Sequence, residues 1–153
     1  MNQIIEGKLA TQGIQRFPSF SYLTEGNNRP QTNQQTEDSW PVVDVRDLYD
    51  SLDITTHKNN NTLQDYEKKI DQAYDMIQKY DRVVICCVAG TSRSPAIAIG
   101  VLVKYYKMTL EEATNLVYQK VRITDINQMH IESLKELLFK TNKRHPSLSI
   151  FAQ

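Results

Sequence analysis

The sequence predicts an α/β fold in which a small central sheet is flanked by helices. Three observations predict this class: apolar, β-branched runs at residues 40–47 and 82–87, an amphipathic helical pattern between them, and further helical patterns after the second run. The 153 residues correspond to about one domain. We therefore expect a single domain over residues 1–153, in which 1–39 carries little regular pattern and 24–39, without apolar side chains, is a polar loop.

The first half of the chain contains strand signals followed by one helix. Scattered apolar residues before residue 24 predict one or two short strands, and residues 40–47 predict another. Thr62, with Asp65 three residues later, predicts the N-cap of a helix that continues to about Lys79. The apolar residues of this segment recur at helical spacing, so we expect one face to be buried.

The second half begins with the most apolar strand signal of the chain. Residues 82–87 are continuously apolar, which is typical of a strand buried on both faces. Residues 94–106 predict a buried helix with Pro95 in its first turn, where no amide donor is needed. Thr109 with Glu112 predicts the N-cap of the next helix.

The last predicted helix spans residues 127–139 and buries Ile131, Leu134 and Leu138. His130 lies on the inner edge of this helix. We interpret it as a packed or half-exposed histidine, and the sequence has no metal-ligand spacing.

Charge and cysteine content restrict the class of partner and the compartment. Lys plus Arg and Asp plus Glu each number 18, so the net charge is zero, which argues against a chain built to bind nucleic-acid phosphates. Residues 90–94 interrupt the longest apolar stretch, so no membrane span is expected, and the first residues lack the pattern of a secretory signal. Cys86 and Cys87 are adjacent and cannot staple a secreted fold, so we expect reduced thiols and a cytoplasmic protein. Lys68 and Lys69 are interpreted as ordinary charged surface. No sequence feature indicates an oligomeric state.

The turn between Cys87 and Arg93 carries the chemistry. Its backbone N–H groups face inward, the following helix adds the partial positive charge of its N-terminus, and Gly90 permits the unusual torsions of a closed anion site. A cation in the first helical turn is disfavoured by the helix dipole, so Arg93 is best explained by a bound dianion. A phosphate site also lowers the pKa of a thiol, and a thiolate beneath phosphate can attack phosphorus in line. The pattern predicts a phosphocysteine intermediate formed without metal or cofactor, whereas Cys86 is interpreted as a small core residue.

Residues 84–95, Val-Ile-Cys-Cys-Val-Ala-Gly-Thr-Ser-Arg-Ser-Pro, resemble the phosphate loop of cysteine-dependent dual-specificity protein phosphatases of the protein tyrosine phosphatase superfamily. The resemblance resumes at residues 122–127 and covers about 40–140. It implies the fold of those enzymes, with Cys87 as the nucleophile and Arg93 as a phosphate ligand. It also implies a cradle of backbone amides, contributed by Val88, Ala89, Gly90, Thr91, Ser92 and Arg93.

The same resemblance assigns supporting roles to two residues and shows one departure. Ser94 would hydrogen-bond the thiolate and ease its departure from phosphocysteine, and Asn127 would brace the phosphate loop. Cys86 stands where the family usually has histidine. That change removes a hydrogen-bonding group that helps to order the loop, so we expect a less depressed pKa at Cys87 and weaker activity.

Cleavage of the P–O bond also needs a proton donor for the leaving group. In the resembling family the donor is an aspartate on the loop after the strand that precedes the phosphate-loop strand. Strand alternation favours Asp47, whereas the family's usual separation from the cysteine favours Asp53. We rank Asp47 first, Asp53 second and Asp50 third. The alternative is that these carboxylates are solvated or pair with Arg46.

These features predict a phosphomonoester hydrolase that acts on phosphotyrosine, and on phosphoserine and phosphothreonine, in proteins. Two alternatives stay open from the sequence. One is a pseudophosphatase that binds phosphorylated partners without turnover. The other is a phosphatase of RNA 5′ ends or another non-protein phosphate.

Overall fold

The computed structural model describes residues 1–14 and 40–142. In these residues four strands form one mixed sheet with the order β1-β2-β4-β3. The strands are β1 (Asn2–Ile5), β2 (Leu9–Gly13), β3 (Val42–Asp44) and β4 (Val83–Cys87). β1 pairs antiparallel with β2, and β2 and β3 lie parallel to β4 on its two sides. The predicted α/β fold is confirmed, and where one or two short strands were expected before residue 24 the structure has two, β1 and β2.

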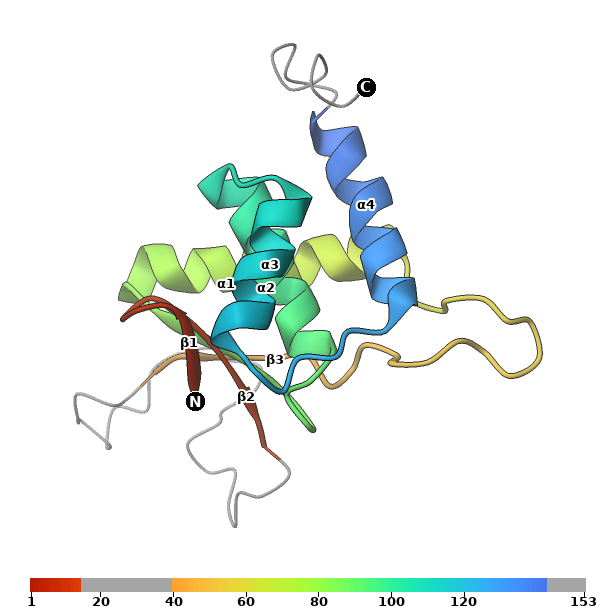
Figure 1. Ribbon diagram of the computed structural model, residues 1–153, viewed down its shortest axis with the longest axis horizontal. Helices are drawn as coiled ribbons and strands as arrows, with labels where there is room; N and C mark the ends of the chain where they lie inside the picture. Colours follow the sequence, from red (N-terminus) through yellow and green to blue (C-terminus); the bar gives the residue numbers. More distant parts are fainter. Residues whose placement is uncertain (15–39, 143–153) are drawn as a thin grey trace.

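Four helices in the described part of the chain lie on one side of this sheet (Figure 1). They are α1 (Leu63–Tyr80), α2 (Arg93–Tyr106), α3 (Leu110–Lys120) and α4 (Gln128–Asn142). α2 lies at the centre, and its residues 94–103 are all buried. Among the residues described, no helix has both the length and the apolar character needed to cross a bilayer.

Both predicted N-caps are present. Thr62 Oγ1 accepts a hydrogen bond from Asp65 N (3.1 Å), and the Asp65 carboxylate accepts from Thr62 N (2.7 Å). Thr109 and Glu112 form the same reciprocal pair at the start of α3, at 3.0 and 2.9 Å. Each pair satisfies two backbone groups that a helix end would otherwise leave without partners.

The two faces of the sheet pack into separate apolar clusters. The helix-covered face contributes alternate residues of the strands, including Val43, Ile85 and Cys87, to the main core. The opposite face carries a smaller cluster that contains Trp40, Val84 and Cys86. Because successive side chains of a strand point to opposite faces, the two adjacent cysteines belong to different clusters.

β3 is shorter than predicted. It ends at Asp44, because the Asp44 carboxylate accepts a hydrogen bond from Arg46 N (2.9 Å) and the chain turns there, with Leu48 N donating to Val45 O (3.2 Å). The expectation that strand alternation extends to Asp47 is therefore wrong. Val43 and Val45 do share the buried face, but Asp47 lies beyond the strand in an irregular segment.

Candidate active site

Residues 88–92 form the loop that is predicted to bind phosphate, here called the phosphate loop, and this loop leaves the sheet at the carboxyl ends of the parallel strands. β2, β3 and β4 all end at this edge, which is where α/β sheets bind ligands. The loop joins the buried strand β4 directly to the N-terminus of the buried helix α2. The amide groups and the dipole at that end of α2 favour an anion.

The end of β2 supports the loop from one side. Ile14 N donates to the carbonyl oxygens of Cys87 (3.0 Å) and Val88 (3.1 Å). Gly90 has φ +77°, the left-handed conformation that glycine adopts without strain. A Cβ on Gly13 would lie 2.6 Å from Ala89 O, so only glycine fits this contact. Gly13 is not predicted from the sequence, because nothing in the chain pattern indicates that β2 reaches the loop.

The Cys87 sulfur lies at the base of the loop and is 2% exposed. Three hydrogen-bonding groups converge on it: Gly90 N at 3.2 Å, Ser94 N at 3.5 Å and Ser94 Oγ at 3.2 Å. Donors in such an arrangement would stabilise a negative charge on the sulfur. Ser94 thus lies beside the Cys87 sulfur, as the family resemblance implies for a partner of the thiolate.

Cys86 has a different environment. It is fully buried on the other face of the sheet, and burial raises the pKa of its thiol to about 12, with the nearby Asp44 acting in the same direction. Its interpretation as a core residue is confirmed.

The opposite side of the loop is braced by the segment before α4. Asp125 N donates to Thr91 O (2.7 Å), and Asn127 N donates to Ser92 Oγ (3.0 Å). Asn127 is therefore adjacent to the loop, as expected, but it contacts the loop through its backbone. Its side chain donates instead to the carbonyl and carboxylate oxygens of Asp50.

Arg93, the first residue of α2, joins the phosphate loop to the segment that follows β3. Its Nη1 donates to the carbonyl oxygens of Arg46 (2.8 Å) and Leu48 (3.0 Å), the two neighbours of Asp47. Within the described residues, Arg93 Nε and Nη2 make no hydrogen bond. Those N–H groups are available to an anion, and the backbone on both sides of Asp47 is held next to Arg93.

The three candidate acids have different environments. Asp53 accepts hydrogen bonds from Thr55 N, Thr56 N and Asn60 Nδ2, which lower the pKa of its carboxyl. Such a carboxylate is a poor proton donor.

Asp50 and Asp47 differ in what their carboxylates contact. Asp50 Oδ1 lies 2.8 Å from His130 Nε2 and 3.1 Å from Asn127 Nδ2. Asp47 is 63% exposed at its side chain and pairs with Lys69 Nζ at 3.2 Å. The Lys69 side chain is only 13% exposed and also donates to Asp44 O (2.9 Å), so its interpretation as ordinary surface is wrong. Asp44 is the buried partner of Arg46.

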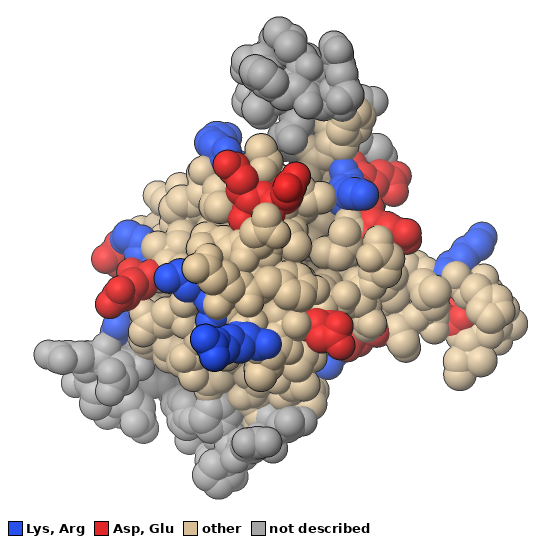
Figure 2. Space-filling view, in the orientation of Figure 1, with Lys and Arg blue, Asp and Glu red and all other residues tan. Residues whose placement is uncertain are grey.

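Charged side chains of both signs are scattered over the face seen in Figure 2, without a continuous field of one sign. Among the described residues, no group of three or more His, Cys, Asp and Glu side chains could hold a metal ion.

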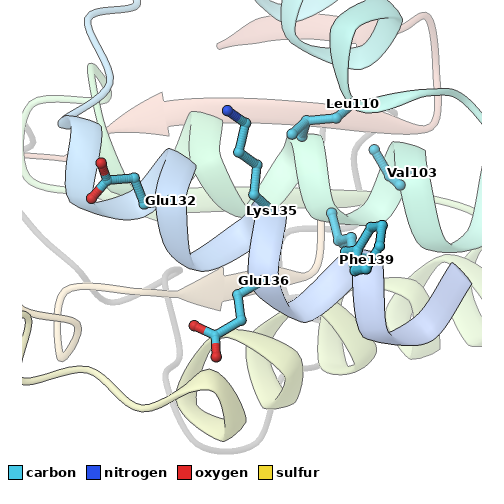
Figure 3. Close-up of a pocket in the computed structure, with 7 residues that line it drawn as sticks. Val103, Leu110, Glu132, Lys135, Glu136 and Phe139 are labelled. Atoms are coloured by element: carbon cyan, nitrogen blue, oxygen red, sulfur yellow. The ribbon is translucent and has the colours of Figure 1, made fainter. Parts of the chain in front are cut away.

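A groove of about 490 Å³ lies along α4, away from the phosphate loop (Figure 3). Figure 3 shows Lys135 directed toward Leu110, and Phe139 beside Val103. None of its lining residues belongs to the phosphate loop or to the segment around Asp47.

Comparisons with known proteins all indicate the same family. The family model described as the catalytic domain of dual specificity phosphatases matches residues 16–138. A probable dual specificity protein phosphatase of Dictyostelium discoideum is 27% identical over 148 residues, which cover 86% of this chain and 36% of that protein. The chain thus spans about a third of the length of this relative.

Two solved structures illustrate the likeness in fold. A leucine rich repeat and phosphatase domain containing protein from Entamoeba histolytica has a TM-score of 0.52 at 25% identity, over 56% of this chain and 61% of that one. A mouse putative dual specificity phosphatase complexed with zinc tungstate has a TM-score of 0.52 at 16% identity, over 56% and 54%.

Proposed function

The chain belongs to the family of dual specificity phosphatase catalytic domains, and on that premise we propose that it hydrolyses phosphomonoesters in proteins through a phosphocysteine intermediate. Phosphotyrosine is the proposed substrate, with phosphoserine and phosphothreonine as further substrates. The observation that carries the proposal is the convergence of Gly90 N, Ser94 N and Ser94 Oγ on the sulfur of Cys87, beneath the N-terminus of α2.

The proposed reaction has two steps. The Cys87 thiolate attacks phosphorus and the P–O bond to the substrate breaks, while Arg93 and the loop amides bind the phosphoryl oxygens. The leaving oxygen takes a proton from Asp47. Water then attacks phosphorus, Asp47 accepts its proton, and the P–S bond breaks to release phosphate. Ser94 Oγ, 3.2 Å from the sulfur, donates to the departing thiolate.

Two contacts support Asp47 as the proposed acid. Arg93 contacts the carbonyls of both neighbours of Asp47, so the backbone of Asp47 adjoins the phosphate-binding arginine. In the described part of the chain, the Asp47 carboxylate contacts only Lys69 Nζ, and at 63% exposure the Asp47 side chain has room to turn toward a bound substrate. The carboxylates of Asp50 and Asp53 are instead occupied by several hydrogen bonds.

The first test is hydrolysis of an aryl phosphate in the presence of a metal chelator. We expect Cys87→Ser to abolish turnover and Arg93→Lys to lose most of it, because a point charge cannot replace a two-pronged guanidinium. Cys86→Ala is the matched control and should stay active, since its side chain lies on the other face of the sheet. Wild-type turnover in Cys87→Ser would rule out the covalent mechanism. Binding of a phosphopeptide without any turnover by the wild type would identify a pseudophosphatase instead.

The second test concerns Asp47. We expect Asp47→Asn to slow hydrolysis of phenyl phosphate and phosphotyrosine peptides by roughly a hundredfold to ten-thousandfold, the usual contribution of a general acid. A dinitrophenyl phosphate should be nearly unaffected, because its leaving group barely needs a proton. Asp53→Asn is the control and should keep the wild-type ratio of the two rates. A leaving-group-dependent loss in Asp53→Asn alone would move the acid to that residue.

A third measurement addresses the substrate class. Peptides that carry phosphotyrosine, phosphoserine or phosphothreonine should be dephosphorylated faster than RNA with a 5′ phosphate, because the chain has no net positive charge to bind a nucleic-acid backbone. Faster turnover of the RNA would contradict the proposed protein substrate.

A further inference from the structure

Two side chains fix the residues that follow Asp47. Asn61 Oδ1 accepts from Tyr49 N (2.8 Å), and Asn61 Nδ2 donates to Tyr49 O (2.8 Å). Asn127 Nδ2 donates to the carbonyl and carboxylate oxygens of Asp50. Arg93 binds the carbonyls of residues 46 and 48. Residues 46, 48, 49 and 50 therefore all have backbone groups that side chains from other segments bind.

The hydrogen bonds around Tyr66 determine the direction of its hydroxyl proton. Tyr66 Oη accepts from Asn59 Nδ2 (2.8 Å) and from Asn61 Nδ2 (3.2 Å). These amides must present nitrogen to Tyr66, because their oxygens accept from the backbone N–H groups of Asn61 and Tyr49. With its oxygen accepting twice, Tyr66 donates its own proton to His130 Nδ1, 2.7 Å away.

This direction assigns the tautomer of His130. Because Nδ1 accepts from Tyr66, the proton of the neutral ring lies on Nε2. Nε2 then donates to Asp50 Oδ1 at 2.8 Å. A directed chain of hydrogen bonds thus runs from the buried side of α1, through the fully buried ring of His130 on α4, to the segment that carries Asp47.

We propose that His130 is a positioning residue, which acts through Asp50 to keep Asp47 in register with the phosphate loop. The proposal rests on the proposed function, in which Asp47 is the acid. Asp50 lies three residues after Asp47, and the same Asp50 is bound by Asn127, whose backbone N–H contacts the loop residue Ser92. His130 therefore connects the acid segment to the helical core, and Asn127 connects it to the phosphate loop.

The charges around the ring agree with its neutral state. Burial lowers the pKa of His130, and the positive charge of Arg93 acts in the same direction, whereas Asp50 raises it. In the described part of the chain, Asp50 on the loop and Tyr66 on α1 contact the ring, and Arg93 on α2 acts on it through its charge. A protonated ring would place a hydrogen on Nδ1, opposite the hydroxyl proton of Tyr66.

The test compares phenyl phosphate with a dinitrophenyl phosphate in His130→Phe, which keeps an aromatic ring but removes both nitrogens. We expect kcat on phenyl phosphate to fall on the order of tenfold to a hundredfold, which is the loss that a small displacement of a catalytic group causes. The dinitrophenyl substrate should be nearly unaffected. The double variant that combines Asp47→Asn with His130→Phe should have the same kcat on phenyl phosphate as Asp47→Asn alone. An equal loss on both substrates, or losses that multiply in the double variant, would overturn the proposal.

Asp50 provides a second comparison that does not disturb the core. Asp50→Ala removes the acceptor of His130 and should reproduce the loss on phenyl phosphate, whereas Asp50→Asn keeps an acceptor oxygen and should recover most of it. A full loss in Asp50→Asn would identify Asp50 itself as the acid and overturn the positioning role. The proposed function has separate tests. The covalent step is wrong if Cys87→Ser retains turnover. If Asp47→Asn has no leaving-group effect, both the assignment of Asp47 as the acid and the present inference are wrong. A leaving-group effect in Asp47→Asn without one in His130→Phe and Asp50→Ala would overturn this inference alone.

Discussion

Cys86 and Cys87 are neighbours in the chain but have different chemical environments. Cys87 faces the helices and has three hydrogen-bonding groups around its sulfur, whereas Cys86 faces the opposite apolar cluster. Burial is the largest cause that raises the pKa of the Cys86 thiol, to about 12. A thiol must lose its proton to act as a nucleophile, so Cys86 is not equipped to react or to form a disulfide with its neighbour.

This contrast predicts selective alkylation. At neutral pH, iodoacetamide should modify Cys87 in the folded protein and leave Cys86 unmodified, as measured by mass spectrometry of peptides. Inorganic phosphate should slow the modification, because it would occupy the proposed cradle. Both cysteines should react in urea, which is the control for reagent access. Comparable labelling of both cysteines in the folded protein would contradict the assignment.

At the scale of secondary-structure elements, the parallel pairing of β3 and β4 brings the segment that carries Asp47 next to the phosphate loop. Parallel neighbours end at the same edge of a sheet, so the segment after β3 emerges beside the phosphate loop after β4. β2, parallel to β4 on its other side, ends at Gly13 against the loop. The phosphate loop thus depends on strands that lie far from it in the chain.

The contact between β2 and the loop gives a prediction for Gly13→Ala. Its Cβ would meet backbone atoms of Ala89 at 2.6 and 2.7 Å, so the loop must move. We expect most of the phosphatase activity to be lost and stability to fall by about 1–3 kcal/mol, as in overpacked sites. Gly7→Ala is the matched control: it strains a residue with φ +74° but meets no atom within 4 Å, so it should lower stability and leave the turnover of folded protein intact. Wild-type turnover in Gly13→Ala would show that β2 does not shape the loop.

For the whole molecule, the buried polar chain through His130 joins α1, α4 and the segment after β3. Its neutral state makes stability depend on pH. Unfolded histidine titrates near 6.5, and burial places the pKa of folded His130 below that value. Between the folded and the unfolded pKa, the unfolded state therefore binds the proton more readily than the folded state. The contribution of neutral His130 to the free energy of unfolding is complete above about pH 6.5 and is lost as pH falls below that value.

Urea unfolding at pH 7.5, 6.5 and 5.5 measures this effect. The wild type should lose stability from pH 6.5 to 5.5, and His130→Gln should lose less over the same interval, because glutamine does not titrate. His57→Gln, at an exposed position, is the control and should follow the wild type. An identical pH dependence in His130→Gln and the wild type would show that the ring is not kept neutral by the fold.

The sequence by itself determined the fold class, both N-caps and the family, and it predicted the residues of the phosphate loop. Each of these depends on residues close together in the chain: Thr62 with Asp65, Thr109 with Glu112, and the segment from Cys87 to Ser94. The family resemblance is confirmed by the match over residues 16–138. Local spacing is enough to predict features whose geometry is local.

Only the tertiary structure decided what surrounds that loop. The Asp44 carboxylate ends β3 early, so strand alternation could not locate Asp47, and the contact of Arg93 with its neighbouring carbonyls did. The asparagines at 59–61 lie in a polar segment of the sequence, yet Asn59 and Asn61 bind Tyr66, which contacts His130. His130 lies 64 residues from Tyr66 and 80 residues from Asp50, its other partner. Such contacts carry no periodic signal in the sequence. They form only after folding has placed the carboxyl ends of the strands next to the inner faces of the helices.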